Sequence, residues 1–321
     1  MVVNVGIIGT GAIAKKLAKA INCVDGANLS AVSSRTLDRA RHFAEEFNVS
    51  LWYEGLNDFL NNTDIDLVYI ATPNNFHYQN TIDALNSGKS VLCEKPFALN
   101  YIESKKMIEI AEKKNLLLVE AMWTKYFPGI KRVKNILDSG ILGDIVTVHG
   151  DLSYLLDGKD RLFDRRMGGG ALLDLGIYPI TVMHHFMGNP ENILASSQFT
   201  ETGVDESTSM IFSYKSGAKA LISCSINAKS TNEFSIFCSK GWIRLNDNFT
   251  RPTSISYFSQ KSGERHEQFL YENLGYEYQI EGVLADFNGN KTESSTVKQS
   301  DTLEIMKILD IVRNKVGLSF E

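Results

Sequence analysis

The sequence predicts an α/β fold in which an N-terminal, doubly wound parallel sheet precedes an α+β domain with an open, mostly antiparallel sheet. Up to about residue 120, short apolar runs alternate with amphipathic stretches, a pattern typical of parallel strands joined by right-handed helical crossovers. From about residue 192 to 271, strand-like runs follow one another without intervening helices, which indicates an antiparallel sheet with one free face. We therefore divide the chain into domains 1–122 and 123–321.

The elements follow from the spacing of apolar residues, which differs between strands and helices. In the first domain we expect strands at 3–8, 28–33, 67–71, 90–93 and 116–119, with a weaker one at 51–53. We expect helices there at 12–22, 36–47, 76–87 and 100–114. In the second domain the expected helices are 127–138, 169–187, 275–288 and 302–315. The expected strands of that domain are 207–214, 218–226, 234–238, 242–245 and 254–258, and 288–300 is a polar loop.

The composition argues against several classes of protein. A net charge of −5 and a pI of about 5.8 give no basic field for nucleic acid or an anionic membrane surface. No apolar run approaches the ~18 residues that a membrane span needs. Because residues 2–8 already read as a strand, we expect no secretory leader. The four cysteines form no CxxC pair, so we expect small core residues of a reduced, cytoplasmic protein and no metal site.

A glycine pattern directly after the first strand predicts a dinucleotide site. The residues are Gly9, Thr10, Gly11, Ala12, Ile13 and Ala14, a G-x-G-x-x-A pattern that opens a helix. Gly9 permits the tight turn, and Gly11 lets backbone amides approach a pyrophosphate at the positive end of the helix. Ala14 is small enough for close packing of the helix on the strand.

The end of the second strand indicates which dinucleotide is preferred. An NAD site usually has an acidic residue there, whereas this chain has Ser33, Ser34 and Arg35. A guanidinium can grip a ribose 2′-phosphate with two hydrogen bonds, so we expect NADP to be preferred, with NAD also possible. Arg35 could instead cap a loop or stack on the adenine.

The fourth strand runs into a polar segment at the same edge of the sheet. From it we expect cofactor contacts by Ala71, Thr72, Pro73, Asn74 and His77. Asn74 or the following Asn75 could cap the next helix. A position on the helix surface is as compatible with His77 as a contact with cofactor ribose or phosphate.

The run Ser90–Cys93 ends abruptly in Glu94, Lys95 and Pro96. In a parallel sheet such a run predicts a buried strand, and ligands bind at the carboxyl ends of these strands. A lysine half out of water there can pass a proton near neutral pH. A Glu-Lys-Pro sequence is also typical of a loop ion pair before a turn, so the pattern alone leaves both interpretations open.

Two later segments carry further candidate residues. Trp123 follows the last strand of the first domain and could wall a nicotinamide pocket or fill a domain interface. Gly168–Gly170 suit a backbone that approaches a ligand, or a flexible loop. Asp174 and Tyr178 stand four apart on one face of a helix, where they could hold substrate hydroxyls and exchange a proton, or form a surface pair. His184 and its neighbour His185 face different ways, so we expect packing or surface roles for them rather than base catalysis.

These segments together resemble the GFO/IDH/MocA oxidoreductases, and most of all the branch with dimeric dihydrodiol dehydrogenases and NADP-dependent xylose dehydrogenases. The resemblance spans the chain and rests on residues 9–14, 71–77, 93–97, 120–128 and 168–179. It implies a Rossmann domain with cofactor contacts by Glu94, Lys95 and Trp123, and a second domain whose open sheet forms a homodimer or homotetramer. It also implies that Lys95 and Tyr178 form the catalytic pair, that Asp174 holds the substrate and that Trp123 lines its pocket. Many family members have histidine where this chain has Tyr178, so the phenol would take over proton transfer.

The predicted function is NADP-dependent hydride transfer between the nicotinamide and a secondary alcohol or carbonyl. The resemblance favours a sugar, polyol or cyclic diol as substrate, whose pocket walls include four candidates that the sequence does not rank, Tyr154, Arg161, Arg165 and Arg166. One alternative is an NADP sensor without catalysis, which would need no proton-transfer pair. Another is an NAD-assisted glycosidase, against which Arg35 argues by favouring an exchangeable NADP.

Overall fold

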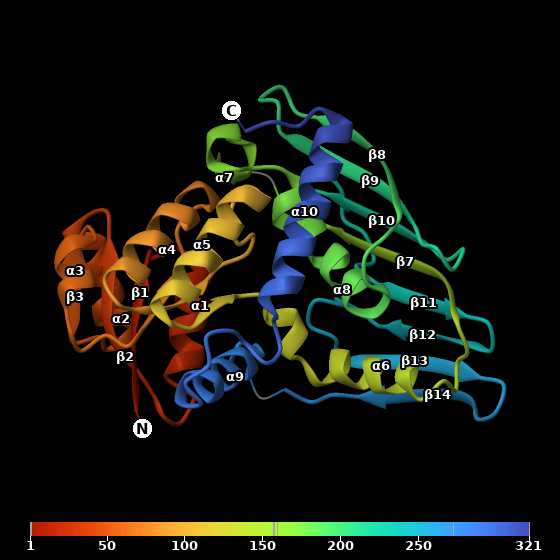
Figure 1. Ribbon diagram of the computed structural model, residues 1–321, viewed down its shortest axis with the longest axis horizontal. Coiled ribbons are helices and arrows are strands. Elements are labelled where there is room, and N and C mark those ends of the chain that lie inside the picture. Colours follow the sequence, from red (N-terminus) through yellow and green to blue (C-terminus); the bar gives the residue numbers. More distant parts are fainter. Residues whose placement is uncertain (1, 157, 159, 272, 321) are drawn as a thin grey trace. The chain divides into compact units, whose positions relative to one another are not determined.

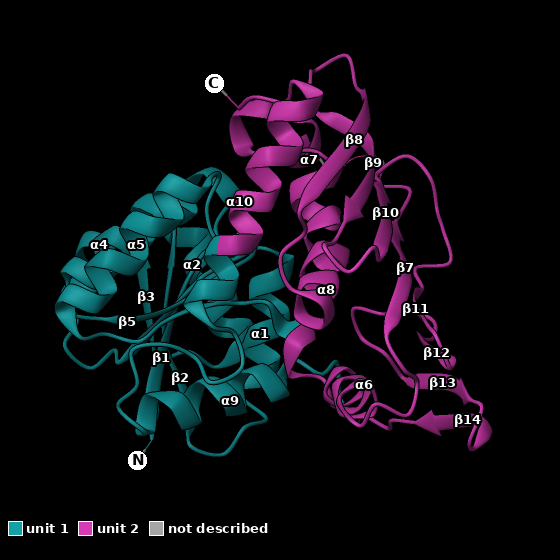
Figure 2. Ribbon diagram, turned by 45° about the vertical axis from the view of Figure 1, so that its right-hand side comes forward, with its two compact units in different colours: residues 1–123, 272–303 teal, residues 124–271, 304–321 magenta. Residues whose placement is uncertain are grey.

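The computed structural model describes residues 2–156, 158, 160–271 and 273–320. The chain forms two compact units, which Figure 2 distinguishes by colour. The first comprises Met1–Trp123 and Glu272–Leu303, and the second comprises Thr124–Tyr271 and Glu304–Glu321. The sequence predicts that the whole segment after residue 122 belongs to the second domain. Part of that segment instead returns to the first unit, for reasons that its contacts explain below.

The first unit contains a six-stranded parallel sheet with the order β3-β2-β1-β4-β5-β6. Its strands β1, β2 and β3 are labelled in Figure 1. The strands are β1 (Val3–Ile8), β2 (Ala27–Ser34), β3 (Leu51–Glu54), β4 (Leu67–Ile70), β5 (Ser90–Cys93) and β6 (Leu118–Glu120). Every residue of β4 and β5 is buried, as expected of central strands covered on both faces. The strand order reverses between β1 and β4, where doubly wound sheets bind their ligands. The predicted doubly wound parallel sheet is thus confirmed.

Helices cover this sheet and include one from near the C-terminus. They are α1 (Ala12–Ile21), α2 (Leu37–Phe47), α3 (Asn57–Asn61), α4 (His77–Asn86), α5 (Tyr101–Lys114) and α9 (Glu277–Asn288), with a 3₁₀ turn η1 (Asn74–Phe76) before α4. Among these, α1 contacts α2 and α9, while α4 contacts α5. The contact of α9 with α1 is one reason why its segment belongs to the first unit. The short helix α3 was not predicted, because its five residues are too few to show a helical period.

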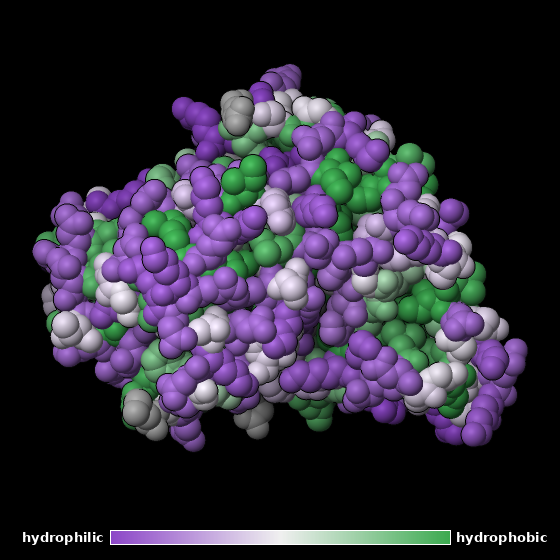
Figure 3. All heavy atoms as spheres, in the orientation of Figure 1, coloured by the Kyte–Doolittle hydropathy of each residue, from purple (hydrophilic) through white to green (hydrophobic). Residues whose placement is uncertain are grey.

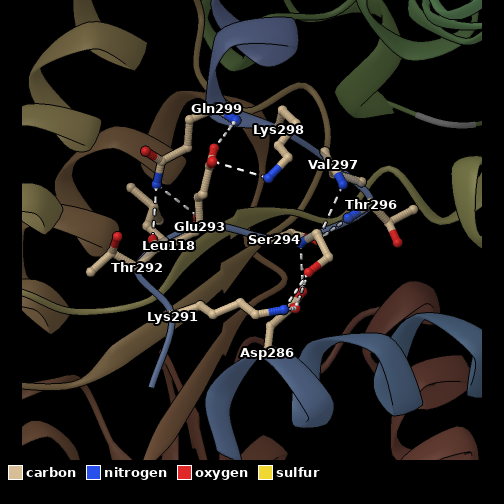
Figure 4. Close-up of polar contacts among 11 residues, drawn as sticks. Leu118, Asp286, Lys291, Thr292, Glu293, Ser294, Thr296, Val297, Lys298 and Gln299 are labelled. Atoms are coloured by element: carbon tan, nitrogen blue, oxygen red, sulfur yellow. Dashed lines mark hydrogen bonds and ion pairs between the residues drawn. The ribbon is translucent and has the colours of Figure 1, made fainter. Parts of the chain in front are cut away.

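The polar loop after α9 covers the edge strand of the sheet (Figure 4). The amide of Leu118 in β6 donates to the Thr292 carbonyl over 3.1 Å. Gln299 donates from Nε2 to the carbonyls of Leu118 and Thr292, both over 3.1 Å. An exposed strand edge offers unpaired backbone groups to other chains, and this loop occupies them. These bonds are the second reason why the segment belongs to the first unit.

Asp286 in α9 fixes the shape of this loop (Figure 4). Its carboxylate is 3 % exposed and accepts hydrogen bonds from the Ser295 amide (2.9 Å) and hydroxyl (2.7 Å) and from Lys291 Nζ (3.0 Å). Burial alone would raise the pKa of Asp286, but these hydrogen bonds favour the ionised form and hold the pKa below its ordinary value.

The second unit contains an eight-stranded sheet with the order β14-β13-β12-β11-β7-β10-β9-β8. Its strands are β7 (Ile145–Ser153), β8 (Asn192–Phe199), β9 (Asp205–Ser213), β10 (Lys219–Ser225), β11 (Phe234–Cys238), β12 (Gly241–Leu245), β13 (Ser254–Ser259) and β14 (Gly263–Gln268). All neighbours are antiparallel except β7 and β10, which run parallel. The predicted mostly antiparallel sheet is therefore confirmed.

Three strands of this sheet, β7, β8 and β14, were not among the predicted strands. β7 lies at its centre, yet Gly150 interrupts the apolar alternation of the strand. The structure explains this glycine, because a Cβ there would lie 2.5 Å from the Phe234 ring. β14 is a polar edge strand, Gly263–Gln268, whose charges hide its strand character and discourage pairing with other chains.

Helices pack on one face of the second sheet. The helical elements around it are η2 (Trp123–Tyr126), α6 (Pro128–Asp138), α7 (Asp160–Phe163), η3 (Arg165–Met167), the π-helical turn η4 (Leu172–Gly176), α8 (Ile177–Met187) and α10 (Gln299–Val316). Of these, η4 and α8 contact both β7 and β10. In the part of the chain that the structure describes, no helix is both long and apolar enough to cross a membrane. Cys93 and Cys224 are buried as expected, whereas Cys23 is exposed, contrary to the expected core position.

Candidate functional site

The turn after β1 has the geometry that a pyrophosphate site needs. Gly9 has a φ of +105°, and a Cβ there would lie 2.7 Å from the Ala71 carbonyl oxygen, so both conformation and space require glycine. A Cβ on Gly11 would meet no atom within 4 Å, which leaves the backbone open to a ligand. Gly11 is also the N-cap of α1, and no side chain caps the helix there. The amides of the first helical turn, which includes Ala12 and Ile13, can therefore bind an anion.

Three of the predicted cofactor segments meet at the carboxyl edge of the parallel sheet. Gly9 contacts the segment after β4, at Ala71 and Thr72. Thr10 Oγ1 lies 3.4 Å from the Ser34 hydroxyl at the end of β2. Arg35, the next residue, is exposed, and its guanidinium has no ion-pair partner among the described residues. The structure thus brings the glycine turn, the end of β2 and the end of β4 together.

The turn after β5 places Lys95 at the same edge. The amide of Glu94 donates to the Ile70 carbonyl over 3.0 Å, which continues the pairing of β5 with β4. The buried Tyr69 hydroxyl donates to Glu94 Oε1, and Lys95 N donates to Glu94 Oε2 over 3.2 Å. Burial and the neighbouring Glu94 raise the pKa of Tyr69, so the phenol stays a neutral donor to the carboxylate. Lys95 is half-buried, as the sequence predicted.

His77 ties this turn to the segment after β4. Its ring is 1 % exposed, with Nδ1 2.8 Å from the Pro96 carbonyl oxygen and Nε2 2.9 Å from the Thr72 carbonyl oxygen. The helix-surface interpretation of His77 was therefore wrong, because the ring is buried between two loops. The expected asparagine cap was also wrong, because Phe76 occupies the N-cap of α4 and Pro73 that of η1. Asn74 is buried in η1.

Trp123, another predicted cofactor residue, has an aromatic partner within the first unit. Its ring stacks on Tyr276, with centroids 4.2 Å apart and planes 8° from parallel. Tyr276 precedes α9, so the segment that returns to the first unit supplies a partner that the local sequence around Trp123 could not reveal. The role of Trp123 toward a nicotinamide stays a prediction.

In the second unit, the glycine run is packed against protein backbone. A Cβ on Gly169 would lie 2.4 Å from the Leu162 carbonyl oxygen, and one on Gly170 would lie 2.1 Å from Asp205 Oδ1. Close packing within the unit thus accounts for these two glycines, for which the sequence alone suggested a nearby ligand or a flexible loop. Asp205 was not predicted, because a single aspartate before a strand carries no distinctive pattern.

Asp174 and Tyr178 lie on consecutive turns of one helical segment. The predicted helix 169–187 begins as the π-helical turn η4, which contains Asp174, and continues as α8 with Tyr178 in its first turn. A π turn is wider than an α turn, and such turns are frequent at functional sites. Asp174 is 8 % exposed, and its Oδ1 lies 2.9 Å from Arg161 Nη2. Tyr178 is half-buried.

The four candidates for the pocket wall differ in whether they contact a predicted site residue. Arg161 contacts Asp174, whereas the Tyr154 hydroxyl accepts a hydrogen bond from Asn248 Nδ2 over 2.7 Å. Arg165 donates to the Ser319 carbonyl, and the exposed Arg166 pairs with Asp164. Arg161 is therefore the candidate associated with a predicted site residue. The pair His184 and His185 lies in the last turn of α8, at the opposite end from Tyr178.

The glycine turn, the uncapped helix and the switch in strand order define a dinucleotide-binding protein. Comparisons with known proteins support this conclusion of dinucleotide binding. The profile described as "Oxidoreductase family, NAD-binding Rossmann fold" matches residues 3–121, and that of the "GFO/IDH/MocA C-terminal domain" matches residues 130–244.

Full-length relatives point the same way. The chain is 30% identical over 330 residues to a trans-1,2-dihydrobenzene-1,2-diol dehydrogenase of Danio rerio, covering 100% of this chain and 98% of that protein. It is 29% identical to the Bos taurus enzyme of the same name, with the same coverage. A solved 3-ketoreductase from Actinomadura kijaniata, in complex with NADP and TDP-benzene, shares the fold at a TM-score of 0.90 and 24% identity, with 98% of each chain covered. This chain belongs to the GFO/IDH/MocA oxidoreductase family. It is an NAD(P)-dependent oxidoreductase, as its sequence predicted.

Proposed function

We propose that this chain transfers a hydride between NADP and a secondary alcohol or carbonyl of a sugar, polyol or cyclic diol. The observation that carries the proposal is the turn after β5, which holds a half-buried Lys95 at the sheet edge that also carries the glycine turn. The names of the relatives, dihydrodiol dehydrogenases, support a cyclic diol or a similar polyhydroxylated compound. We assign the first unit to the cofactor and the second to the substrate.

When bound, NADP supplies the redox chemistry by taking a hydride from the carbinol carbon. The protein manages the remaining proton and the substrate hydroxyls. In the oxidation direction Tyr178 takes the hydroxyl proton, while the positive charge of Lys95 stabilises the negative charge that develops on oxygen. Asp174, held by Arg161, accepts a hydrogen bond from a second substrate hydroxyl. These roles rest on the family resemblance and on the position of each side chain within its own unit.

The residues at the glycine turn fit the pyrophosphate of the cofactor, because Gly9 permits the tight turn and the open space beside Gly11 lets a ligand approach the backbone. Arg35 supports a preference for NADP. It directly follows Ser34, whose hydroxyl lies near Thr10 of the glycine turn, and its guanidinium is exposed. A 2′-phosphate there would meet the Arg35 guanidinium and the Ser34 hydroxyl, whereas the Ser33 hydroxyl is buried and donates to the Gly55 carbonyl.

A substrate panel with both cofactors tests the proposed function. Purified protein is mixed with NADP or NAD and with sugars, polyols and cyclic diols, and the near-ultraviolet absorbance of reduced nicotinamide is followed. We expect reduction of NADP with at least one compound and a lower kcat/KM with NAD. An NADP sensor would give no reduction with any compound, and an NAD-assisted glycosidase would cleave glycosides without net reduction. Either result would contradict the proposal.

We further propose that the open face of the second sheet joins two copies of this chain. Strand register places Leu194, Ile211 and Leu221 side by side on β8, β9 and β10, and all three side chains are exposed. Phe237 and Phe258 extend this apolar face across β11 and β13. Hydrophobic residues, in green, are visible in Figure 3 where β8, β9 and β10 lie in Figure 1. The family resemblance argues that the occupant is a second copy.

Sedimentation at micromolar concentration should give the mass of a dimer or tetramer, and a monomer would contradict the second proposal. We also propose that the protein is cytoplasmic and binds neither nucleic acid nor a membrane. It is supported by the acidic net charge of −5 and by cysteines that form no CxxC pair.

A further inference from the structure

Asp205, the first residue of β9, lies buried beneath the segment that carries Asp174 and Tyr178. Its side chain is 0% exposed. Oδ2 accepts hydrogen bonds from the Leu172 amide over 2.7 Å and from the Thr208 hydroxyl over 2.8 Å. Leu172 begins the π-helical turn η4, so Asp205 satisfies an amide that the helix itself leaves without an acceptor.

The glycine run closes over the other carboxylate oxygen. Gly170 has a φ of +110°, and its Cα approaches so closely that a Cβ would lie 2.1 Å from Asp205 Oδ1. The Gly170 amide donates to the Leu162 carbonyl over 2.8 Å, which holds the loop down. Asp205 Oδ1 has no hydrogen-bond partner among the described residues. The carboxylate is thus enclosed between the sheet and the start of η4.

The far end of the π turn is also held by the sheet. A Cβ on Gly176, the last residue of η4, would lie 2.9 Å from Cys224 Sγ on β10. Cys224 Sγ donates to the Thr208 carbonyl over 3.8 Å, so both ends of η4 rest on one small cluster in β9 and β10. Asp174 lies within this turn, and Tyr178 follows in the first turn of α8.

We propose that Asp205 is a positioning residue that sets the location of Asp174 and Tyr178 by holding the Leu172 amide at the start of η4. The inference rests on the proposed function for the part that concerns turnover. It assigns no contact with substrate to Asp205, since the carboxylate is buried. A shift of about 1 Å in a reacting group can cost on the order of 10²-fold in rate, so a loosened η4 should lower kcat.

Two substitutions at this position separate positioning from general stability. Asp205→Asn keeps an acceptor oxygen for the Leu172 amide at the same volume, whereas Asp205→Ala removes it. For Asp205→Ala we expect a loss in kcat/KM of roughly 10- to 100-fold with an unchanged Kd for NADP. We expect Asp205→Asn to retain kcat/KM within about threefold, as its hydrogen bond to Leu172 persists. The matched control is Asp286→Asn, which alters another buried carboxylate, in the first unit, and should leave kcat/KM unchanged.

Kinetic constants are expressed per NADP-binding site, so that unfolded protein does not count. Parental kcat and KM in Asp205→Ala would overturn the proposal, as would equal losses in the alanine and asparagine variants. Should Asp205→Ala fail to fold, Thr208→Val removes the second donor to the same Oδ2. A lowered kcat in that variant would support the proposal, and parental kcat and KM would overturn it.

Hydrogen exchange provides a measurement that does not depend on turnover. Amides in 170–178 should exchange faster in Asp205→Ala, or in Thr208→Val, than in the parent. Unchanged exchange would overturn the positioning role even if activity fell. Full activity in Tyr178→Phe would instead refute the proposed function and leave the exchange result to decide the role of Asp205.

Discussion

The buried carboxylate of Asp205 predicts how the stability of the protein varies with pH. Burial raises the pKa of Asp205 from its ordinary 3.8 to about 7, although the hydrogen bonds from Thr208 and Leu172 act in the opposite direction. The folded state therefore binds this proton more tightly than the unfolded state. This contribution to stability is fully present below the unfolded pKa and is lost as pH rises through about 7.

The size of the effect follows from the two pKa values. A difference of about 3 in pKa corresponds to roughly 4 kcal/mol of unfolding free energy across this range. Asp205→Asn cannot ionise, so the stability of the variant relative to the parent should rise by up to that amount between about pH 4 and pH 7 and then level off. Any packing difference between the two side chains adds a constant that does not depend on pH.

Urea unfolding followed by circular dichroism, at several pH values from acid to mildly alkaline, measures this difference directly. Asp286→Asn serves as a control of opposite sign, because hydrogen bonds hold the pKa of Asp286 below its ordinary value. The stability that Asp286 contributes is present above its unfolded pKa and is lost as pH falls through the folded one. A pH-independent difference between Asp205→Asn and the parent, or one that falls with rising pH, would show that folding does not raise the pKa of Asp205.

Three further predictions concern two residues of the first unit and one of the second. Gly9→Ala should abolish measurable NADP binding in a fluorescence titration, because the added Cβ would lie 2.7 Å from the Ala71 oxygen at a φ of +105°; affinity near the parental value would contradict the assigned turn. Arg35→Ala should lower kcat/KM for NADP by roughly 10-fold or more while that for NAD changes little, since charge-assisted hydrogen bonds to phosphate are among the stronger ones. An unchanged ratio of the two would show that Arg35 does not bind the 2′-phosphate. Arg161→Ala should raise the substrate KM and leave the Kd of NADP unchanged, because it frees Asp174 from its ion pair; a parental KM would exclude this role.

The parallel sheet could be predicted almost strand by strand, because its strands are continuous apolar runs separated by helical patterns. The strands of the second sheet were harder to predict from the sequence. Gly150 broke the pattern of its central strand because a phenylalanine ring fills the space of the missing side chain. β14 is too polar to read as a strand. In β7 the local signal is overridden by packing against Phe234, which is distant in sequence, whereas β14 pairs with β13, the strand directly before it in the chain.

The candidate site likewise contains residues that the local sequence reveals and residues that it does not. The glycine turn, Lys95 and the Asp174–Tyr178 segment are visible because each is a compact motif. Tyr276 and Asp205 are not, because each reaches its partner from more than thirty positions away in the chain. His77 was recognised as a candidate, but its burial between the Thr72 and Pro96 carbonyls depends on how two loops meet.

We propose that Lys95 and Tyr178 serve one proton-coupled hydride transfer, and the turnover of two variants tests this pairing. Tyr178→Phe and Lys95→Met should each lower kcat on the best substrate of the panel by about 10²- to 10⁴-fold, the usual cost of losing an acid–base group. NADP affinity should survive in Tyr178→Phe, which changes a residue of the second unit. Near-parental kcat in Tyr178→Phe would exclude Tyr178 as the group that takes the hydroxyl proton.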